Sequence, residues 1–539
     1  MITDLLSCYP LLTVLTFWPL LAALILSPVK NERTIRLVTM AAALIELVLA
    51  IPLLGFESRA GFQFEELIAW APEWKLNYHL GVDGLSILMI WLSILTLPMC
   101  VLCSWTYIGR RVKEFHICLL LMTMACVGVF SALDTVLFYV FWEALLIPMY
   151  LMIAIWGSDD RRYASIKFFL YTLAGSTLLL VAIVALRITG GTFSIPELMT
   201  TEFSYGFQYW IFLAFFIAFA IKVPMFPFHT WLPAAHVQAP SAGSVILAAV
   251  LLKMGTYGFL RFSIPMAPVA STDFAPMMIA ISVASILYGG AVALGQQDIK
   301  KLIAYSSVAH MGFVTLGIFL FSLDGVNGAI FQMLNHGIIT GALFMMVGAV
   351  YERSHSREIV KNMGLGKYLP AFMFFWGLFG LASFGFPGTN GFVGEFMVIL
   401  AAFRANTTLG LLVIPGALLS AAYILKVTLK MAWGQPASPA SGGSWRDLKK
   451  KEWAYLALPA VLVVWLGLAP GGVLGLIEPS VEDTLKTFHQ RNGRVDLVQV
   501  TSPAGRPEGL IIEENILPEP TVTTTEPAAA EPAETEMEK

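Results

Sequence analysis

Six ionisable side chains stand inside long apolar stretches of the sequence, where a charge is costly. They are Glu143, Lys222, Lys253, His310, His336 and Glu395. A charge at the centre of a bilayer costs at least about 2.5–3.5 kcal/mol on insertion scales, so such residues usually pair, face water or carry protons. Carboxylates, amines and imidazoles all exchange protons, and histidine does so near physiological pH. Their recurrence on successive stretches predicts a proton relay, with each proton shift changing its neighbours through Coulomb coupling.

Each of these residues also has a purely structural interpretation. Glu143 lies among bulky apolar neighbours and could be a neutral acid bonded to a helix backbone. Lys222 and Lys253 could extend their long side chains to the membrane interface. His310 and His336 could be satisfied core residues, although hydroxyl and amide groups beside them favour a water chain. The relay is the preferred hypothesis for all six.

Two of the six lie beside expected helix breaks. Pro224 and Pro227 follow Lys222, and Pro387 precedes Glu395. Proline removes a backbone donor, and a break inside a membrane is tolerated only where protein or water satisfies the freed groups. Broken helices are common at transporter ion sites, and one in each half suggests an internal five-span repeat.

The composition of the chain indicates the class of protein that holds these residues. Of the 539 residues, 57% are hydrophobic and only 13% charged, with a mean hydropathy of +0.75. So few charges cannot cover a soluble surface, and the net charge of −3 leaves no large basic patch for nucleic acid. No dinucleotide or ATP loop motif occurs, and Cys100 and Cys103 lie inside an apolar stretch as packing residues. We therefore expect no cofactor and no metal in this chain.

The sequence predicts an all-α polytopic membrane protein with about fourteen transmembrane helices, since a span needs about 20 apolar residues. The candidate spans are 11–28, 34–55, 84–107, 115–133, 135–157, 164–188, 208–228, 240–262, 274–295, 302–322, 327–350, 370–402, 408–432 and 453–475. Alternate loops carry nearly all the basic residues, Lys300 among them, and the others are acidic. By the positive-inside rule, this places both termini outside.

Several further residues have local interpretations. Asp83 and Asp134 begin spans and are expected as helix N-caps. His229 and His236 flank Pro233, where they could line an inner mouth or belong to a loop. Residues 513–539 contain eight glutamates and one lysine, which is typical of a disordered acidic extension.

Four stretches resemble the antiporter-like membrane subunits of respiratory complex I. They are residues 222–248 (from Lys-Val-Pro-Met-Phe-Pro-Phe-His), 298–312 (from Asp-Ile-Lys-Lys-Leu-Ile-Ala-Tyr), 335–353 and 391–396. The last two are similar to the M-type branch, and the resemblance runs from about Gly81 to Gly434.

That resemblance implies fourteen spans and two inverted five-helix repeats, broken near Pro224 and Pro387. It implies that Glu143 pairs with Lys222, that Lys253 is central, and that His310 and His336 relay protons. Glu395 would end the path, where L- and N-type subunits have lysine. The expected division is 1–110, N-terminal helices; 111–265 and 266–435, the two antiporter-like halves; 436–476, an inside loop and last helix; and 477–539, a disordered outside tail.

The same resemblance implies a bacterial inner-membrane subunit that pumps protons without a redox centre. Flavin, iron–sulfur clusters and quinone would belong to partner subunits, and its neighbours would be L- and N-type subunits, small membrane subunits and lipid. Alternatives are a multisubunit Na+/H+ antiporter, a proton-pumping membrane hydrogenase, or a scaffold that does not pump. The stretch 335–353 favours complex I among these.

Overall fold

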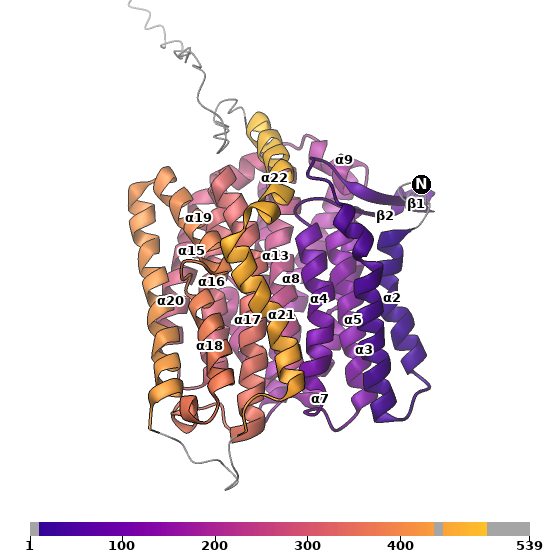
Figure 1. The fold of residues 1–539 in the computed structure, drawn as a ribbon. Helices are drawn as coiled ribbons and strands as arrows, with labels where there is room; N and C mark the ends of the chain where they lie inside the picture. The colour runs from indigo at the N-terminus through magenta and orange to yellow at the C-terminus, as the bar shows by residue number, and fades with distance from the viewer. Residues whose placement is uncertain (1–9, 436–445, 493–539) are drawn as a thin grey trace, which may run out of the picture. The chain divides into compact units, whose positions relative to one another are not determined.

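Long apolar helices dominate the computed structural model, which describes residues 10–435 and 446–492 (Figure 1). Twelve helical segments in these ranges are long and apolar enough to cross a membrane. The predicted all-α polytopic membrane architecture is confirmed. The count of fourteen spans and the inverted repeats stay predictions, because the helix Leu11–Leu26 is short for a span and the predicted span 370–402 is divided into the helices Pro370–Ser383 and Asn390–Ala405.

The elements up to the first break are α2 (Leu11–Leu26), α3 (Glu32–Leu49), η1 (Ile51–Gly55), β1 (Gln63–Ala71), η2 (Pro72–Trp74), β2 (Leu76–Val82), α4 (Ile87–Ser104), α5 (Val112–Ser131), α6 (Thr135–Ala144), α7 (Leu146–Trp156), α8 (Arg161–Gly190), α9 (Ile195–Thr200) and α10 (Tyr205–Lys222). The next are η3 (Phe228–Thr230), α11 (Trp231–Gln238), α12 (Ser241–Ile246), η4 (Leu247–Leu251), α13 (Leu252–Gly258), η5 (Phe259–Ser263), α14 (Ile264–Met266), α15 (Pro268–Gly295), α16 (Ile299–Phe319) and α17 (Leu323–Ser354). The last are η6 (Val360–Asn362), η7 (Leu365–Lys367), α18 (Pro370–Ser383), α19 (Asn390–Ala405), α20 (Thr407–Trp433), α21 (Lys450–Leu468) and α22 (Gly471–Arg491).

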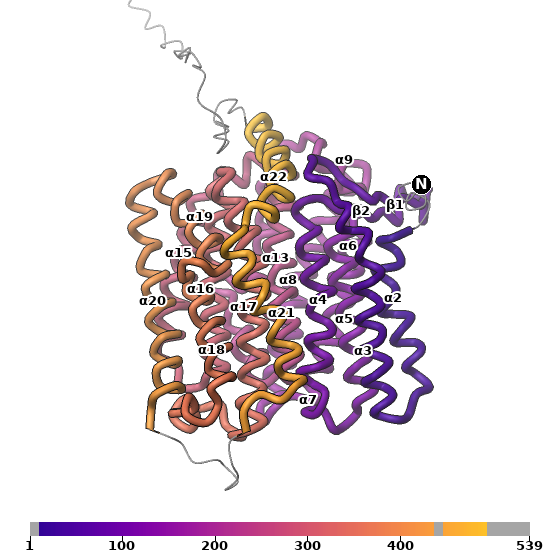
Figure 2. Tube along the Cα trace, viewed as in Figure 1, coloured from indigo at the N-terminus to yellow at the C-terminus, as the bar shows by residue number. Residues whose placement is uncertain are grey.

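The core of the bundle is formed by the run Ser241–Met266 and by α16 and α17, which are almost wholly buried. Peripheral helices instead expose large apolar side chains, such as Ile188 and Trp433, each 78% exposed. Those side chains suit contact with lipid. Figure 2 shows α21 beside α4 and α17, joining the two ends of the sequence.

The predicted break near Pro224 is confirmed, because α10 ends at Lys222 and helix resumes only at η3. The groups freed there find partners. The N–H of Phe226 donates to Ser285 Oγ (3.0 Å), and Trp231 Nε1 donates to the carbonyl of Ile221 (2.8 Å). Tertiary bonds thus replace the missing helical ones at the end of the lysine-bearing helix.

The break near Pro387 is confirmed as well. α18 ends at Ser383 and α19 begins at Asn390, with Gly385 and Gly388 at φ +72° and +89° between them. The carbonyl of Asn390 also accepts from Asn335 Nδ2 (2.7 Å), so a side chain of α17 contacts the start of α19.

One end of the bundle, here called the hairpin end, carries elements that sequence patterns did not predict. The strands β1 and β2 pair antiparallel, with Leu67 opposite His79. Glu66 on β1 accepts the N–H groups of Leu12 and Thr13 (2.6 and 3.0 Å), so the hairpin caps α2. α22 lies at the same end (Figure 1), where Ser480 Oγ accepts from the N–H of Gly84 (2.9 Å).

α22 corrects two predicted boundaries. The last span ends at Leu468 rather than 475, and residues 477–491 are helical rather than a disordered tail. The physical reason is an apolar stripe that α22 buries, formed by Val473, Ile477, Val481, Leu485 and Phe488. The remainder of the expected tail, residues 493–539, lies outside the described residues.

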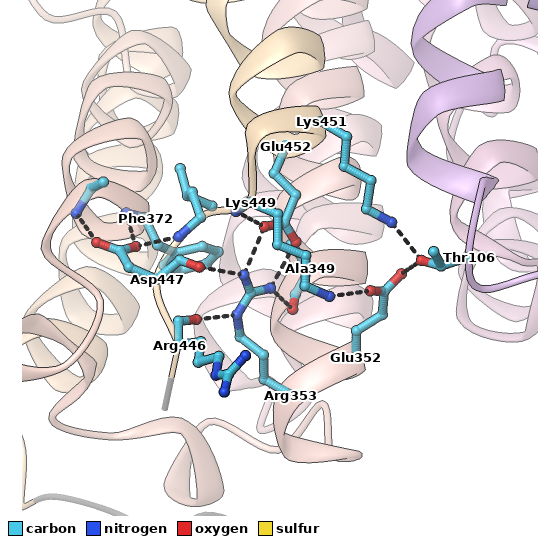
Figure 3. A network of polar contacts seen from close by, with 12 residues as sticks. Thr106, Ala349, Glu352, Arg353, Phe372, Arg446, Asp447, Lys449, Lys451 and Glu452 are labelled. Carbon is cyan, nitrogen blue, oxygen red and sulfur yellow. Dashed lines mark hydrogen bonds and ion pairs between the residues drawn. The ribbon is translucent and has the colours of Figure 1, made fainter. Parts of the chain in front are cut away.

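The opposite end, here called the basic end, is fastened around Arg353 at the end of α17 (Figure 3). Its guanidinium donates to both oxygens of Glu452 (2.8 and 2.7 Å) and to the carbonyls of Ala349, Arg446 and Asp447. Asp447 in turn accepts the first N–H groups of α18. One arginine therefore connects α17 and α21 directly, and α18 through Asp447.

Candidate functional site

Lys253 lies at the centre of the bundle and contacts a histidine of the neighbouring helix. Its side chain is fully buried, and its Nζ lies 2.7 Å from Nδ1 of His336 on α17. Nζ also donates to the carbonyl of Ala248 in the π-helical turn η4. The amine is thus aimed at an imidazole in a site without exposure to solvent.

A second pair continues from the first. Nδ1 of His310 on α16 lies 2.7 Å from Oε1 of Glu395 on α19, and both side chains are 4% exposed. The same carboxylate oxygen accepts from Gln332 Nε2 (3.0 Å), and Nε2 of His310 lies 3.2 Å from the Tyr423 hydroxyl. Fixed hydrogen bonds therefore hold both ring nitrogens of His310.

The two pairs meet through their histidines. The rings of His310 and His336 have centroids 5.8 Å apart, and Nε2 of His336 has no partner among the described residues. Four of the six predicted site residues therefore form one buried line, from Lys253 through His336 and His310 to Glu395. A rotated ring or one water molecule would complete it.

Lys222 and Glu143 lie apart from this line. Lys222 is 4% exposed, and its Nζ lies over the ring of Trp142, 4.8 Å from the centroid. The implied ion pair with Glu143 is not formed: no contact within 4.0 Å joins them in the described ranges. Glu143 is half-buried at the junction of α6 and α7, where Pro148 leaves a carbonyl without its helical partner.

Close helix packing sets Lys222 against the helix of Lys253. A Cβ on Gly255 would lie 3.1 Å from Lys222 Cβ and 2.9 Å from the carbonyl oxygen of Phe219. A Cβ on Gly258 would lie 2.5 Å from the Phe219 ring. Only glycine lets α10 approach α13 so closely, so these two glycines position Lys222.

Other ionisable residues gather toward the basic end. His236 is fully buried and stacks on Phe344 of α17 at 4.5 Å, while His229 is buried beside Phe226 and Tyr288. Lys300 was expected in a loop, but it is 5% exposed in the first turn of α16. Its Nζ is drawn inward because it donates to the carbonyl of Ala239.

The two predicted caps differ in outcome. Asp134 caps α6 by accepting the N–H groups of Val136 and Leu137 (2.9 and 3.2 Å), which confirms that prediction. The prediction for Asp83 is wrong, because Ser86 is the N-cap of α4. Asp83 instead accepts the N–H groups of Leu85 and Ser86 in the preceding turn (3.2 and 3.1 Å) and forms an ion pair with Arg261.

Sequence reasoning missed four polar or aromatic side chains around these residues: Tyr423, Gln332, Trp142 and Arg261. Gln332 lies four positions before His336, and Arg261 eight positions after Lys253, so helical periodicity could have indicated both. Tyr423 and Trp142 carry no such signal in an aromatic-rich sequence. Across residues 10–435 and 446–492, no group of three His, Cys, Asp or Glu side chains is arranged to hold a metal ion, and the expected lack of a cofactor stays a prediction.

Comparison with known proteins identifies relatives along nearly the whole chain. A family model described as NADH:quinone oxidoreductase/Mrp antiporter, TM matches residues 132–420. NADH-quinone oxidoreductase subunit M of Rhodobacter capsulatus is 45% identical, covering 91% of this chain and 99% of the relative. NADH-ubiquinone oxidoreductase chain 4 of Arabidopsis thaliana is 41% identical, covering 90% and 99%.

Solved structures give the same result as the sequence comparison. A chain of respiratory complex I from Thermus thermophilus has a TM-score of 0.82 and 30% identity, with 88% of this chain and 99% of that chain covered. A chain of the Mrp complex from Dietzia sp. shares the fold, with a TM-score of 0.80 and 21% identity over 91% of this chain and all of that one. The chain therefore belongs to the NADH:quinone oxidoreductase/Mrp antiporter transmembrane family, among its subunit M and chain 4 members.

Proposed function

We propose that this chain is a proton-translocating membrane-arm subunit of an NADH:quinone oxidoreductase. The observation that carries the proposal is the buried line of Lys253, His336, His310 and Glu395, whose two direct contacts are each 2.7 Å. Nothing in a purely structural core requires two histidines, a lysine and a glutamate in one row. Each of these groups can take up and release a proton.

The geometry supports stepwise transfer. A proton passes in either direction between Lys253 Nζ and Glu395, through His336 and His310. Each transfer changes the charge facing the next group, and Coulomb coupling is strong where water is scarce. Lys222 would act on this line of residues after its Nζ leaves the Trp142 ring. Its charge would then act on Lys253, because the two helices are in close contact at Gly255.

The wider setting follows from the relatives. We propose that L- and N-type antiporter-like subunits and small membrane subunits are its neighbours in a bacterial inner membrane. Flavin, iron–sulfur clusters and the quinone site would belong to other subunits of the complex, and this chain would hold no redox centre. Basic loops at one end of the bundle and the acidic hairpin at the other support a basic end inside and a hairpin end outside.

The test compares two lysines in the assembled complex. Lys253→Met removes the amine from the relay, whereas Lys426→Met alters a half-buried lysine that donates to the Leu294 carbonyl (2.9 Å), away from the relay residues. Proton uptake and NADH oxidation are measured in inverted vesicles, normalised to NADH:ferricyanide activity. We expect pumping to fall by at least about 100-fold in Lys253→Met, as for loss of a proton-transfer group, and to persist in Lys426→Met. Normal pumping in both variants would refute the relay.

Purification distinguishes this proposal from the antiporter. A tagged chain extracted in mild detergent should bring flavin, iron–sulfur signals and NADH:quinone activity with it. Recovery with membrane partners alone, together with Na+-dependent transport, would favour the multisubunit antiporter instead.

A further inference from the structure

A polar stripe leads from Lys253 toward the hairpin end. Tyr257 and Arg261 follow Lys253 at four and eight positions, and residues four apart are neighbours on one helix face. Arg261 Nε donates to the Tyr257 hydroxyl (3.0 Å), and that hydroxyl lies 3.5 Å from the carbonyl of Phe130. Three long polar side chains therefore follow one face of the central helical run.

The stripe ends in a buried ion pair. Arg261 Nη2 lies 2.6 Å from Asp83 Oδ1, and the two side chains are 2% and 7% exposed. Asp83 stands between β2 and α4, so the pair joins the central helix to the hairpin end. Replacing a buried ion pair with apolar residues is often neutral or stabilising, so stability alone does not explain its presence.

Two segments close over this pair. The ring of Phe62 lies 5.0 Å from the Arg261 guanidinium. A Cβ on Gly84 would lie 2.7 Å from the carbonyl oxygen of Leu476, so α22 packs directly on the turn that carries Asp83. The pair therefore lies between the relay and the surface of the hairpin end, beneath a cover that contacts it closely.

We infer that the Asp83–Arg261 ion pair is an exit gate for protons leaving Lys253 toward the hairpin end; this rests on the proposed function. A proton leaves Lys253 along this stripe and reaches Asp83. Water would carry it past Tyr257, because the contacts of that hydroxyl are Arg261 Nε and the Phe130 carbonyl. Neutral Asp83 loses its attraction for Arg261, the pair separates, and the proton leaves for the aqueous phase. Ionised Asp83 then pairs with Arg261 again and closes the path.

The first test removes the titrating group. Asp83→Asn in the assembled complex, reconstituted in liposomes, should lower proton pumping per NADH:ferricyanide unit by at least about tenfold. Tyr257→Phe keeps the ring and removes only the hydroxyl that bonds to Arg261 Nε, so it gives a second test of the path should Asp83→Asn fail to assemble. Normal pumping in either assembled variant would overturn the gate.

A double variant distinguishes a gate from a structural contact. Asp83→Asn combined with Arg261→Gln leaves two neutral amides that can bond to each other. If the pair only fastens α4 to the central helix, the double variant regains pumping and the gate is refuted. A gate requires the charges, so we expect pumping to stay low.

Two controls complete the design. Arg353→Gln with Glu452→Gln neutralises the ion pair at the basic end, which is similarly buried at 9% and 1%, and pumping per assembled complex should not change. A loss there as large as in the Asp83 variants would overturn the assignment. Lys253→Met tests the relay itself: normal pumping in that variant refutes the proposed function, whereas its failure beside normal Asp83→Asn pumping refutes only the gate.

Discussion

Lys222 shows how one buried charge can have two alternative partners. A desolvated cation over an indole ring gains about 2 kcal/mol, and Nζ lies over Trp142 in this structure. The adjacent residue is Glu143, whose carboxylate makes no hydrogen bond or ion pair within the part of the chain that the structure describes. We expect the lysine to exchange the ring for this carboxylate during pumping, and that exchange would act as a switch.

Trp142 therefore offers a test of that switch. Trp142→Leu removes the aromatic face, so Lys222 should remain with Glu143 and pumping should fall about tenfold, which corresponds to about 1.4 kcal/mol. Trp142→Phe keeps an aromatic face and should retain most activity. Proton uptake in inverted vesicles, normalised to assembled complex, gives both values. Equal activities in the two variants would show that the ring contributes packing only.

The site residues could be predicted as far as their charge made them conspicuous. Lys253 and His336 lie 83 residues apart in sequence and touch in the structure, and both stood out because ionisable groups are rare in apolar spans. Their neutral partners could not be recognised in the sequence in this way. Tyr423 is one of sixteen tyrosines, and only the packing of α20 against α16 shows that it contacts His310.

At the scale of elements, each helix break leaves backbone groups that a neighbouring side chain must satisfy. The segment between α18 and α19 turns on Gly385 and Gly388, both in the left-handed region. A Cβ on Gly385 would lie 3.1 Å from Glu395 Oε2, whereas one on Gly388 would meet nothing within 4 Å. The break thus positions the acid at the end of the proposed relay.

These glycines form a matched pair of variants. Gly385→Ala and Gly388→Ala each force an L-residue into the left-handed region, at a cost of about 1–2 kcal/mol. Only Gly385→Ala also displaces the carboxylate from His310. We expect similar losses of thermal stability in the two purified complexes, but a loss of pumping confined to Gly385→Ala. Equal pumping defects would mean that backbone strain alone disturbs the site.

The elements themselves were predictable where proline or apolar length determined them. Pro224 and Pro387 indicated both breaks. The π-helical turns on either side of α13 left no sign in sequence, because their residues are ordinary helix formers under tertiary constraint. α22 was missed because Pro479 and its acidic residues are typical of a tail, although its buried residues recur at helical spacing.

The whole bundle carries a buried ion pair toward each end, with the relay between them. Asp83–Arg261 lies toward the hairpin end and Arg353–Glu452 toward the basic end. Their surroundings differ. Arg261 continues the face of Lys253, whereas the hydrogen bonds of the Arg353 guanidinium within the described ranges go to backbone carbonyls and Glu452 (Figure 3). The first pair therefore suits proton movement, and the second suits assembly.

Arg353→Gln should accordingly destabilise the protein without slowing the relay. It leaves Glu452 buried without its cation and frees the segment that leads into α21, at a cost of about 3–5 kcal/mol. We expect a lower yield and melting temperature of the purified complex, with normal pumping in the fraction that assembles. Arg404→Gln is the control, because its ion pair with Asp324 is 61% and 38% exposed and contributes at most about 1 kcal/mol. Unchanged stability in Arg353→Gln, or an equal loss in Arg404→Gln, would contradict this role, because only a buried clamp should make the first variant worse than the second.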